Sequence, residues 1–220
     1  MAITASSGTT TSSGITVSRP SWNDMYENYP NESIPSSEFY SMVSKELVEL
    51  VKRAPNDWEN TCAARMSYAL NRSGIKLPSI GGYSLKGDDG FRYWMRVKEL
   101  KDYMSKRFSN PDISYNPKQI QNITENRRSK LKDEMIEKVN LVQSEFLPKI
   151  SNKKGIIVFD VIGWGNASGH FTLWDGKDLV YVGPGDHNNP DSPEYYFWYT
   201  LEGQDGRVIQ TKKISFWELK

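Results

Sequence analysis

The spacing of apolar residues changes at residue 153, and this change constrains the fold more than any other feature of the sequence. Between residues 37 and 147, apolar side chains recur at the three- and four-residue intervals of amphipathic helices. From residue 156 onward they are mostly β-branched or aromatic and come in short runs, as in strands. Helical segments followed by strands predict an α+β fold, with helices against one face of an antiparallel sheet.

Four segments are predicted to be helical, at residues 37–54, 61–73, 91–108 and 124–147. Pro55 ends the first of them because proline cannot continue a helix. Asn60 suits the N-cap of the second helix, and Gly74 suits the left-handed position just past its end. The fourth segment carries one apolar side under a heavily charged surface, which predicts a peripheral helix.

The strands are predicted at residues 156–162, 170–174 and 179–182, with the "DG" pair at 175 and 176 as the turn of a hairpin. Further candidates lie within residues 194–201 and 206–219. Composition fits one globular unit, since 37% of the residues are hydrophobic and 25% are charged. We therefore expect a single domain over residues 19–220.

The first 18 residues differ in composition from the rest of the chain. They hold ten Ser or Thr and two Gly, with no Lys or Arg before Arg19. Such a segment cannot bury enough apolar surface to offset its ordering entropy, so residues 1–18 are predicted to be a disordered leader. The segment also lacks the basic start and apolar core of a secretory signal peptide.

Several classes of protein are disfavoured by the sequence. The formal net charge is +1, which gives no basic footprint for nucleic acid. The longest wholly apolar run, "IIVF" at 156–159, is far shorter than the roughly 20 residues of a membrane span. No zinc-binding spacing, phosphate-binding loop or dinucleotide fingerprint is present, so neither a metal nor a cofactor is expected.

Cys62 is the only cysteine in the chain, and it falls in the first turn of the predicted helix at 61–73. The positive end of the helix dipole and the unpaired backbone N–H groups there favour a thiolate. This position is typical of a reactive thiol. The alternative is that Cys62 is a small hydrophobe on the same stripe as Met66.

A nucleophilic cysteine usually needs a base, and the chain offers only His170 and His187. His170 begins a predicted strand directly after the loop "GWGNASG", whose glycines let a substrate approach the backbone. His187 lies in a polar turn, where a solvated surface histidine is the simpler interpretation. His170 is the candidate base, and the alternative is a core histidine bonded to a nearby carbonyl.

The segments around these two residues resemble a known family. "NTCAARMSYALNRSG", "NPKQ", "KKGIIVF" and "GWGNASGHFTLWDG" occur in that order, and they resemble the type VI secretion amidase effectors of the fourth family. These are papain-like, NlpC-type peptidoglycan amidases, and the resemblance covers roughly residues 19–215. It implies that Cys62 is the nucleophile and His170 the general base. It also implies cleavage of the amide between D-glutamate and meso-diaminopimelate in wall peptide stems.

The third catalytic residue departs from the family's pattern. Members carry an Asp about eleven positions past the histidine, but that count reaches Tyr181 in this chain. If the hairpin is longer here, Asp186 becomes the candidate implied by the resemblance. Trp164 and Asn166, close to His170, are candidate substrate contacts, with a plain core role as the alternative for Trp164.

The charged segment near 118–150 lies between "NPKQ" and "KKGIIVF", which are close together in the relatives, so it is predicted to be a helical insertion. It could contact an immunity protein or the delivery machinery, or it could be a solvated surface helix. The resemblance further implies export without a signal peptide by a type VI secretion machine, action in the periplasm of a rival cell, and a cognate immunity protein. The alternatives are a noncatalytic binding domain on a papain-like scaffold and a housekeeping wall hydrolase.

Overall fold

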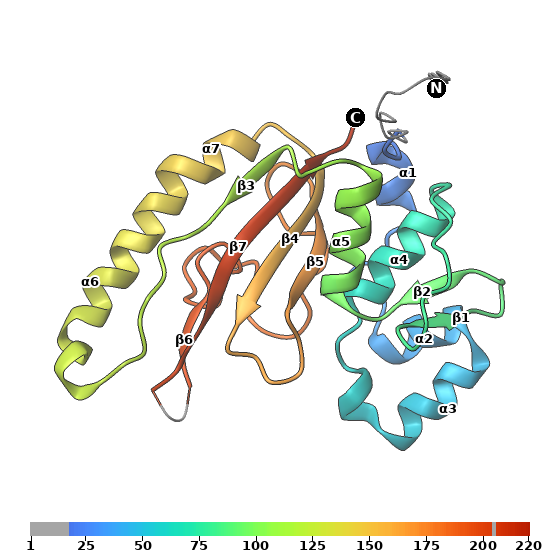
Figure 1. Cartoon of the computed structure of the whole chain (residues 1–220), viewed down its shortest axis with the longest axis horizontal. Helices are drawn as coiled ribbons and strands as arrows, with labels where there is room; N and C mark the ends of the chain where they lie inside the picture. The colour runs from blue at the N-terminus through green and yellow to red at the C-terminus, as the bar shows by residue number, and fades with distance from the viewer. Residues whose placement is uncertain (1–17, 204–205) are drawn as a thin grey trace, which may run out of the picture.

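The centre of the molecule is a five-stranded antiparallel sheet that helices cover on both faces (Figure 1). The structure is a computed structural model and describes residues 18–203 and 206–220. The predicted leader at 1–18 therefore lies outside the described residues, except for Ser18. In the described part, no helix is both long and apolar enough to cross a membrane.

Helices come first along the chain and the long strands come last. The helices are α1 (Trp22–Glu27), α2 (Ser36–Val43), α3 (Lys45–Arg53), a 3-10 turn (Pro55–Trp58), α4 (Cys62–Arg72), α5 (Val97–Arg107), α6 (Glu125–Leu141), a π-helical turn (Val142–Phe146) and α7 (Leu147–Ile150). The strands are β1 (Ser84–Lys86), β2 (Arg92–Trp94), β3 (Ile113–Tyr115), β4 (Gly155–Ile162), β5 (Gly169–Trp174), β6 (Thr200–Glu202) and β7 (Val208–Glu218).

The main sheet has the order β3-β7-β4-β5, and β6 pairs with the first residues of β7. β4 and β5 form a hairpin in which Phe159 faces His170 across the ladder. β5 therefore lies at the edge of the sheet, with His170 near its first residue. β1 and β2 form a separate two-stranded sheet beside α2 and α4 (Figure 1).

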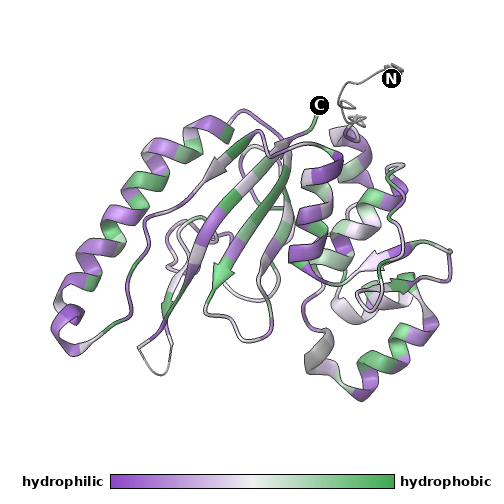
Figure 2. Ribbon diagram, in the orientation of Figure 1, coloured by the Kyte–Doolittle hydropathy of each residue, from purple (hydrophilic) through white to green (hydrophobic). Residues whose placement is uncertain are grey.

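Alternate residues of β4 point to two different hydrophobic clusters. Ile156 and Val158 pack with residues of α4 and α5, whereas Ile157 and Phe159 pack with residues 142–150 on the opposite face. A strand buried on both faces must be apolar along its whole length, and Figure 2 shows the central strands as largely hydrophobic beside a mainly hydrophilic α6. The prediction of helices on one face only is therefore wrong.

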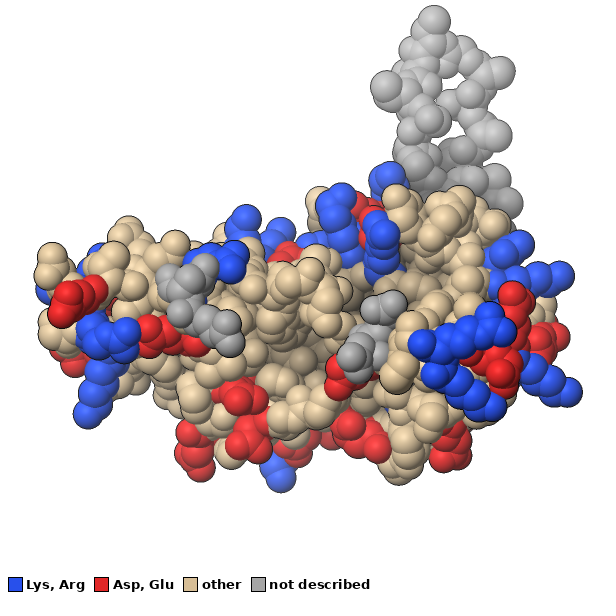
Figure 3. All heavy atoms as spheres, turned by 90° about the horizontal axis from the view of Figure 1, so that it is seen from below, with Lys and Arg blue, Asp and Glu red and all other residues tan. Residues whose placement is uncertain are grey.

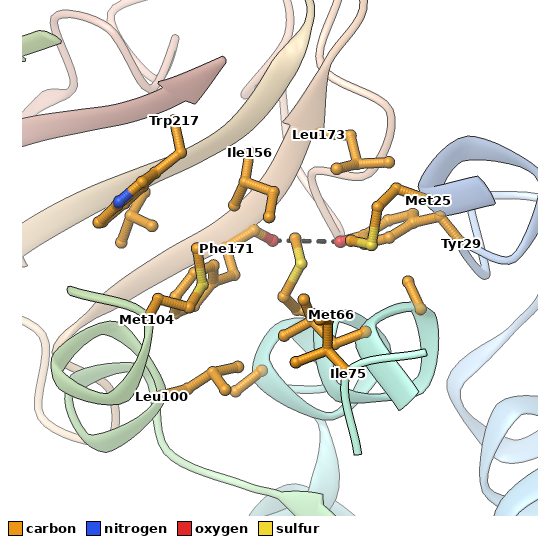
Figure 4. Close-up of a cluster of buried hydrophobic side chains, with 14 of the residues drawn as sticks. Met25, Tyr29, Met66, Ile75, Leu100, Met104, Ile156, Phe171, Leu173 and Trp217 are labelled. Carbon is orange, nitrogen blue, oxygen red and sulfur yellow. Dashed lines mark hydrogen bonds between the residues drawn. The ribbon is translucent and has the colours of Figure 1, made fainter. Parts of the chain in front are cut away.

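The cluster between the sheet and the helices fixes α4 against β5. Met66 of α4, Leu100 of α5 and Phe171 of β5 converge there and are fully buried (Figure 4). The hydroxyl of Tyr29 donates a hydrogen bond to the Phe171 carbonyl at 3.3 Å. Full burial of one such side chain contributes roughly 1.5–3 kcal/mol. This packing holds the start of α4 beside the start of β5.

The predicted helix at 37–54 is two helices, because Ser44 is extended (φ −165°, ψ 139°). Its hydroxyl accepts the N–H of Glu46 as the N-cap of α3 and donates to Asp88. The predicted helix at 91–108 is also wrong in its first part, since residues 92–94 pair with β1 as strand β2. The helix at 61–73 is confirmed as α4.

The predicted strand at 179–182 is wrong. Only an isolated bridge joins Leu179 to Trp174, and the N–H of Tyr181 donates to the hydroxyl of Thr172 at 2.9 Å instead of joining a ladder. Within the candidate at 194–201, only residues 200 and 201 lie in a strand. Residues 195–199 instead bury their aromatic rings against the far face of the sheet.

Lys138 on α6 is buried without an ion-pair partner among the described residues. The contribution of Lys138 to the unfolding free energy of the protein should therefore depend on pH. Its ammonium donates to Thr200 Oγ1 at 2.9 Å, and burial lowers the pKa of Lys138 to about 7. Between that value and the ordinary 10.5 the unfolded chain holds a proton that the folded protein has released. Unfolding free energy should therefore rise with pH in this window, by at most about 1.4 kcal/mol per unit.

Urea unfolding at pH 7, 8 and 9 tests this expectation. Lys138→Met should remove the increase of unfolding free energy with pH that Lys138 causes in the wild type, because the variant has no ammonium to bury. Lys132→Met, which changes an exposed lysine on the same helix, is the matched control and should keep the wild-type slope. Equal slopes in wild type and Lys138→Met would contradict the assignment.

Candidate active site

Cys62 is the first residue of α4 and is 6% exposed. Burial raises the pKa of the Cys62 thiol, and hydrogen bonds with the backbone of Phe171 and Ala63 offset part of this effect. The contact with Phe171 places the sulfur beside β5, one residue from His170. The resting thiol is protonated, so its activation requires a neighbouring base.

His170 is the second residue of β5 and is 5% exposed. Burial lowers the pKa of His170 to about 3, although the hydrogen bond with the Tyr181 backbone acts in the opposite direction. The imidazole is therefore neutral at physiological pH. A neutral imidazole can accept a proton, as a general base must.

The hydrogen bonding of His170 determines which ring nitrogen is free. Its Nε2 lies 2.8 Å from the carbonyl oxygen of Tyr181. A carbonyl oxygen can only accept, so Nε2 must carry the proton and donate it. In the neutral ring, Nδ1 is then unprotonated and is the atom that can take a proton from another group.

Two tyrosine rings fix the plane of the imidazole. Tyr196 stacks on His170 with ring centroids 4.5 Å apart and an angle of 15°, and Tyr181 lies at 5.7 Å and 24°. His187 stacks on Tyr196 at 4.5 Å. His187 is thus a buried part of this aromatic stack, not the solvated surface histidine expected from the sequence.

Four of the five predicted site residues line one cavity of about 210 Å³. Cys62 and His170 belong to it, together with Trp164 and Asn166. The indole of Trp164 donates to the Tyr199 hydroxyl at 3.4 Å and packs edge-on against Tyr196. Trp164 therefore packs against the aromatic cluster and also faces the cavity, while Asn166 is exposed.

The structure does not bring Asp186 to His170. Asp186 is exposed and is not among the residues that line this cavity, and no described hydrogen bond or ion pair joins its carboxylate to the imidazole. The chain beyond Leu179 leaves the ladder, so the Tyr181 carbonyl occupies the position at Nε2. Counting eleven residues from His170 does reach Tyr181, but a residue type cannot reveal a role for its backbone carbonyl.

A network of polar contacts holds the segment that carries this carbonyl. The Tyr181 hydroxyl lies 2.7 Å from Thr61 Oγ1, which accepts from Nε of Arg65 at 2.8 Å. The Glu32 carboxylate accepts the N–H groups of Val182 and Gly183. Both ends of the segment are therefore anchored to the helical half of the molecule.

Arg65 is the buried cation of this network. It is 1% exposed and makes no ion pair within the described part of the chain. Its guanidinium donates to backbone carbonyls at Pro30, Asn31 and Ile34 and lies 4.3 Å from the centroid of the Tyr181 ring. Several carbonyl acceptors and an aromatic face can satisfy a buried guanidinium without a carboxylate.

The arrangement brings a thiol, a neutral imidazole and a helix N-terminus to one cavity. The first N–H groups of α4 have no acceptor within the helix, and they lie next to Cys62, where an oxyanion would form. In the described part of the chain, no group of three or more His, Cys, Asp or Glu residues is placed to hold a metal ion. The chemistry that the site can perform is nucleophilic attack by sulfur with an imidazole base.

Asp186→Asn is expected to leave kcat/KM within about twofold of the wild-type value. An exposed carboxylate that does not contact the imidazole contributes little, and most such surface changes amount to less than about 0.5 kcal/mol. Initial rates of amide hydrolysis measure the effect. A fall of a hundredfold or more, with the fold intact by circular dichroism, would instead give Asp186 the orienting role expected from the sequence.

Comparisons with known proteins agree on one family. The sequence model of the family described as "Type VI secretion system (T6SS), amidase effector protein 4" matches residues 58–217. No match was found among curated proteins.

Among solved structures, the fold is similar to the Tae4–Tai4 effector–immunity complex from Enterobacter cloacae, with a TM-score of 0.62, 23% identity, and 92% of this chain and 100% of that chain covered. It is similar to the effector Tae4 from Enterobacter cloacae alone, with a TM-score of 0.61, 22% identity, and coverage of 94% and 100%. The Tae4/Tai4 selenomethionine variant from Salmonella typhimurium gives a TM-score of 0.60, 22% identity, and coverage of 92% and 100%. These likenesses confirm the predicted α+β fold of the papain-like, NlpC type.

Proposed function

The chain belongs to the family of type VI secretion system amidase effector protein 4, and on this premise we propose that it is a cysteine amidase acting on the bacterial wall. Its substrate is the peptide stem of peptidoglycan. The bond cleaved is the amide between the side-chain carboxyl of D-glutamate and meso-diaminopimelate. Residues 19–220 form one catalytic domain, with the segment near 118–150 as an insertion.

One observation carries this proposal. Cys62 and His170 line the same cavity, and the hydrogen bond of Nε2 to the Tyr181 carbonyl leaves Nδ1 of His170 free to act as a base. Both residues lie within the segment matched by the family. A cysteine and a histidine in this relation are typical of covalent acyl transfer.

The reaction begins when Nδ1 of His170 takes the proton from the Cys62 thiol. The sulfur attacks the amide carbonyl carbon, and backbone N–H groups at the start of α4 stabilise the oxyanion that forms. His170 then gives its proton to the nitrogen of diaminopimelate as the C–N bond breaks. The products of this half-reaction are a free amine and a thioester on Cys62.

Water completes the cycle. His170 removes a proton from the water molecule, the resulting hydroxide attacks the thioester carbonyl, and the C–S bond breaks to release the glutamate carboxyl group. The imidazolium returns its proton to the departing thiolate, which restores the Cys62 thiol and the neutral His170. The Tyr181 carbonyl orients the ring throughout and accepts from the imidazolium while it exists, in the way the third member of a triad does. Because this acceptor is neutral, it stabilises the imidazolium less than a carboxylate would.

The biological setting follows from the family. The protein is delivered by a type VI secretion machine to the periplasm of a neighbouring cell, where the wall is accessible. Titles of the similar structures describe Tae4 effectors bound to the immunity protein Tai4. By analogy with these complexes, the producing cell makes a cognate immunity protein that blocks this cavity.

Digestion of purified diaminopimelate-type muropeptides, with products identified by mass spectrometry, tests the proposal. Release of one fragment that ends with glutamate and of a second that begins with diaminopimelate identifies the bond and supports the proposal. Cleavage at a different amide would support an amidase activity but contradict the assignment of the bond. Intact muropeptides after incubation with folded protein would overturn the proposed reaction.

A further inference from the structure

Cys62 also lines a second cavity, of about 410 Å³. It shares Asn60, Cys62 and Asn166 with the first cavity, so the two meet at the thiol. Its outer wall is the start of α5, including Arg96 and Glu99. On the face seen in Figure 3, Lys and Arg side chains and Asp and Glu side chains both occur, and neither sign covers that face alone.

Glu99 brings an unsatisfied acceptor to the cavity. Its side chain is 27% exposed, yet its Oε2 atom is buried and has no hydrogen-bond partner among the residues that the structure describes. The other oxygen, Oε1, lies 4.0 Å from Arg96, at the limit of an ion pair. Since Oε2 is buried, Oε1 is the oxygen that a ligand can reach, and its distant pairing with Arg96 leaves it available to a ligand donor.

Arg96 brings an available cation next to it. Its side chain is 57% exposed, and its guanidinium stacks 4.0 Å from the centroid of the Tyr83 ring. Stacking holds the guanidinium plane in place but leaves its N–H groups free for a planar acceptor. Lys98, also on this wall, differs because it is paired with Asp102 at 3.7 Å.

We propose that this second cavity binds a zwitterionic amino acid group, with its ammonium on Glu99 and its carboxylate on Arg96. The inference rests on the proposed function, because the group belongs to the residue whose nitrogen departs when Cys62 attacks the amide. Diaminopimelate carries such a group, an ammonium and a carboxylate on its far carbon. Lysine at the same stem position offers the ammonium alone, so the cavity selects diaminopimelate stems over lysine stems.

The test compares kcat/KM for two muropeptides that differ only in diaminopimelate or lysine at the third stem position. Wild type should prefer diaminopimelate by roughly 10–100-fold, the range expected for one charge-assisted hydrogen-bonded pair. Arg96→Met should lower kcat/KM for diaminopimelate by a similar factor and leave the lysine stem within about twofold. Glu99→Gln should lower both, because both substrates carry the ammonium.

Lys106→Met, an exposed charge at the far end of α5, is the matched control and should leave both rates unchanged. Calorimetric binding of the diaminopimelate muropeptide to Cys62→Ala protein, with and without Arg96→Met, separates binding from catalysis and should show about a tenfold or greater loss. An active wild type whose preference and affinity survive Arg96→Met and Glu99→Gln overturns this inference alone. A wild type that cleaves neither stem overturns the proposed function together with it.

Discussion

Cys62→Ala is expected to lower the rate of amide hydrolysis by about 10⁴-fold or more, because it removes the atom that forms the covalent bond to the substrate. The neighbouring hydroxyl of Thr61 is poorly placed to replace the sulfur as nucleophile, since it is engaged with Tyr181 and Arg65. Residual activity would come from binding and from the backbone N–H groups at the start of α4. Product formation from muropeptides, followed over hours at high enzyme concentration, measures the difference.

The fold of Cys62→Ala should be preserved. The change deletes one sulfur atom from a helix end, and a small deletion of this kind costs about 1 kcal/mol. Thermal unfolding should therefore show a transition within a few degrees of that of wild type. If the variant keeps more than a tenth of the wild-type rate while folded, Cys62 is a small core hydrophobe and the amidase chemistry lies elsewhere.

The sequence offers few candidates for a nucleophilic thiol and its base, so the hypothesis narrows to Cys62 and His170. The chain has one cysteine and two histidines, and a helix start and a strand start are positions that sequence patterns mark well. The structure places Cys62 and His170 at those positions and in one cavity. Local patterns also identified α4, β4 and β5, since each is a continuous periodic segment.

Features that depend on distant partners could not be predicted. Ser44 breaks a helical pattern because its hydroxyl caps α3 and contacts Asp88, which is 44 residues away. Residues 92–94 follow a helical spacing, yet they pair with β1. In both cases a tertiary contact outweighs a weak local propensity.

The packing of residues 142–150 and 195–199 on the second face of the sheet was not predicted, because it too depends on tertiary contacts. Val142 and Phe146 belong to a segment whose composition is mostly polar, and only their spacing marks them as buried. The aromatic run at 195–199 predicts a strand by composition, but its rings pack in the cluster that also contains Val142, Phe146 and Ile150. The partner of His170 shows a similar limit, because Nε2 of His170 contacts the backbone carbonyl of Tyr181 and not the carboxylate of Asp186 that the sequence suggests.

Gly169→Ala should abolish most of the activity, whereas Gly155→Ala should not, although both changes bring a Cβ atom against a backbone carbonyl oxygen. Gly169 also has a φ of +157°, which L residues rarely adopt, so its variant carries additional backbone strain. A Cβ atom on Gly169 would lie 2.1 Å from the Phe159 carbonyl oxygen, and one on Gly155 would lie 2.1 Å from the Trp217 carbonyl oxygen. Each substitution must displace a strand, at a cost of about 1–3 kcal/mol in unfolding free energy. Only at Gly169 does the displaced strand carry His170 as its next residue.

A displacement of about 1 Å at a catalytic group can cost on the order of 100-fold in rate, so we expect a loss of that size in Gly169→Ala. Gly155 begins β4 and pairs with Trp174, at the end of β5 away from His170, so its variant should keep a rate within about threefold of wild type at a temperature where it is folded. Unfolding in urea and hydrolysis rates, measured on both variants, separate the two effects. Equal rates in two equally destabilised variants would mean that the position of His170 tolerates movement of β5, and the backbone contact with Tyr181 would then not be what sets the geometry of the base.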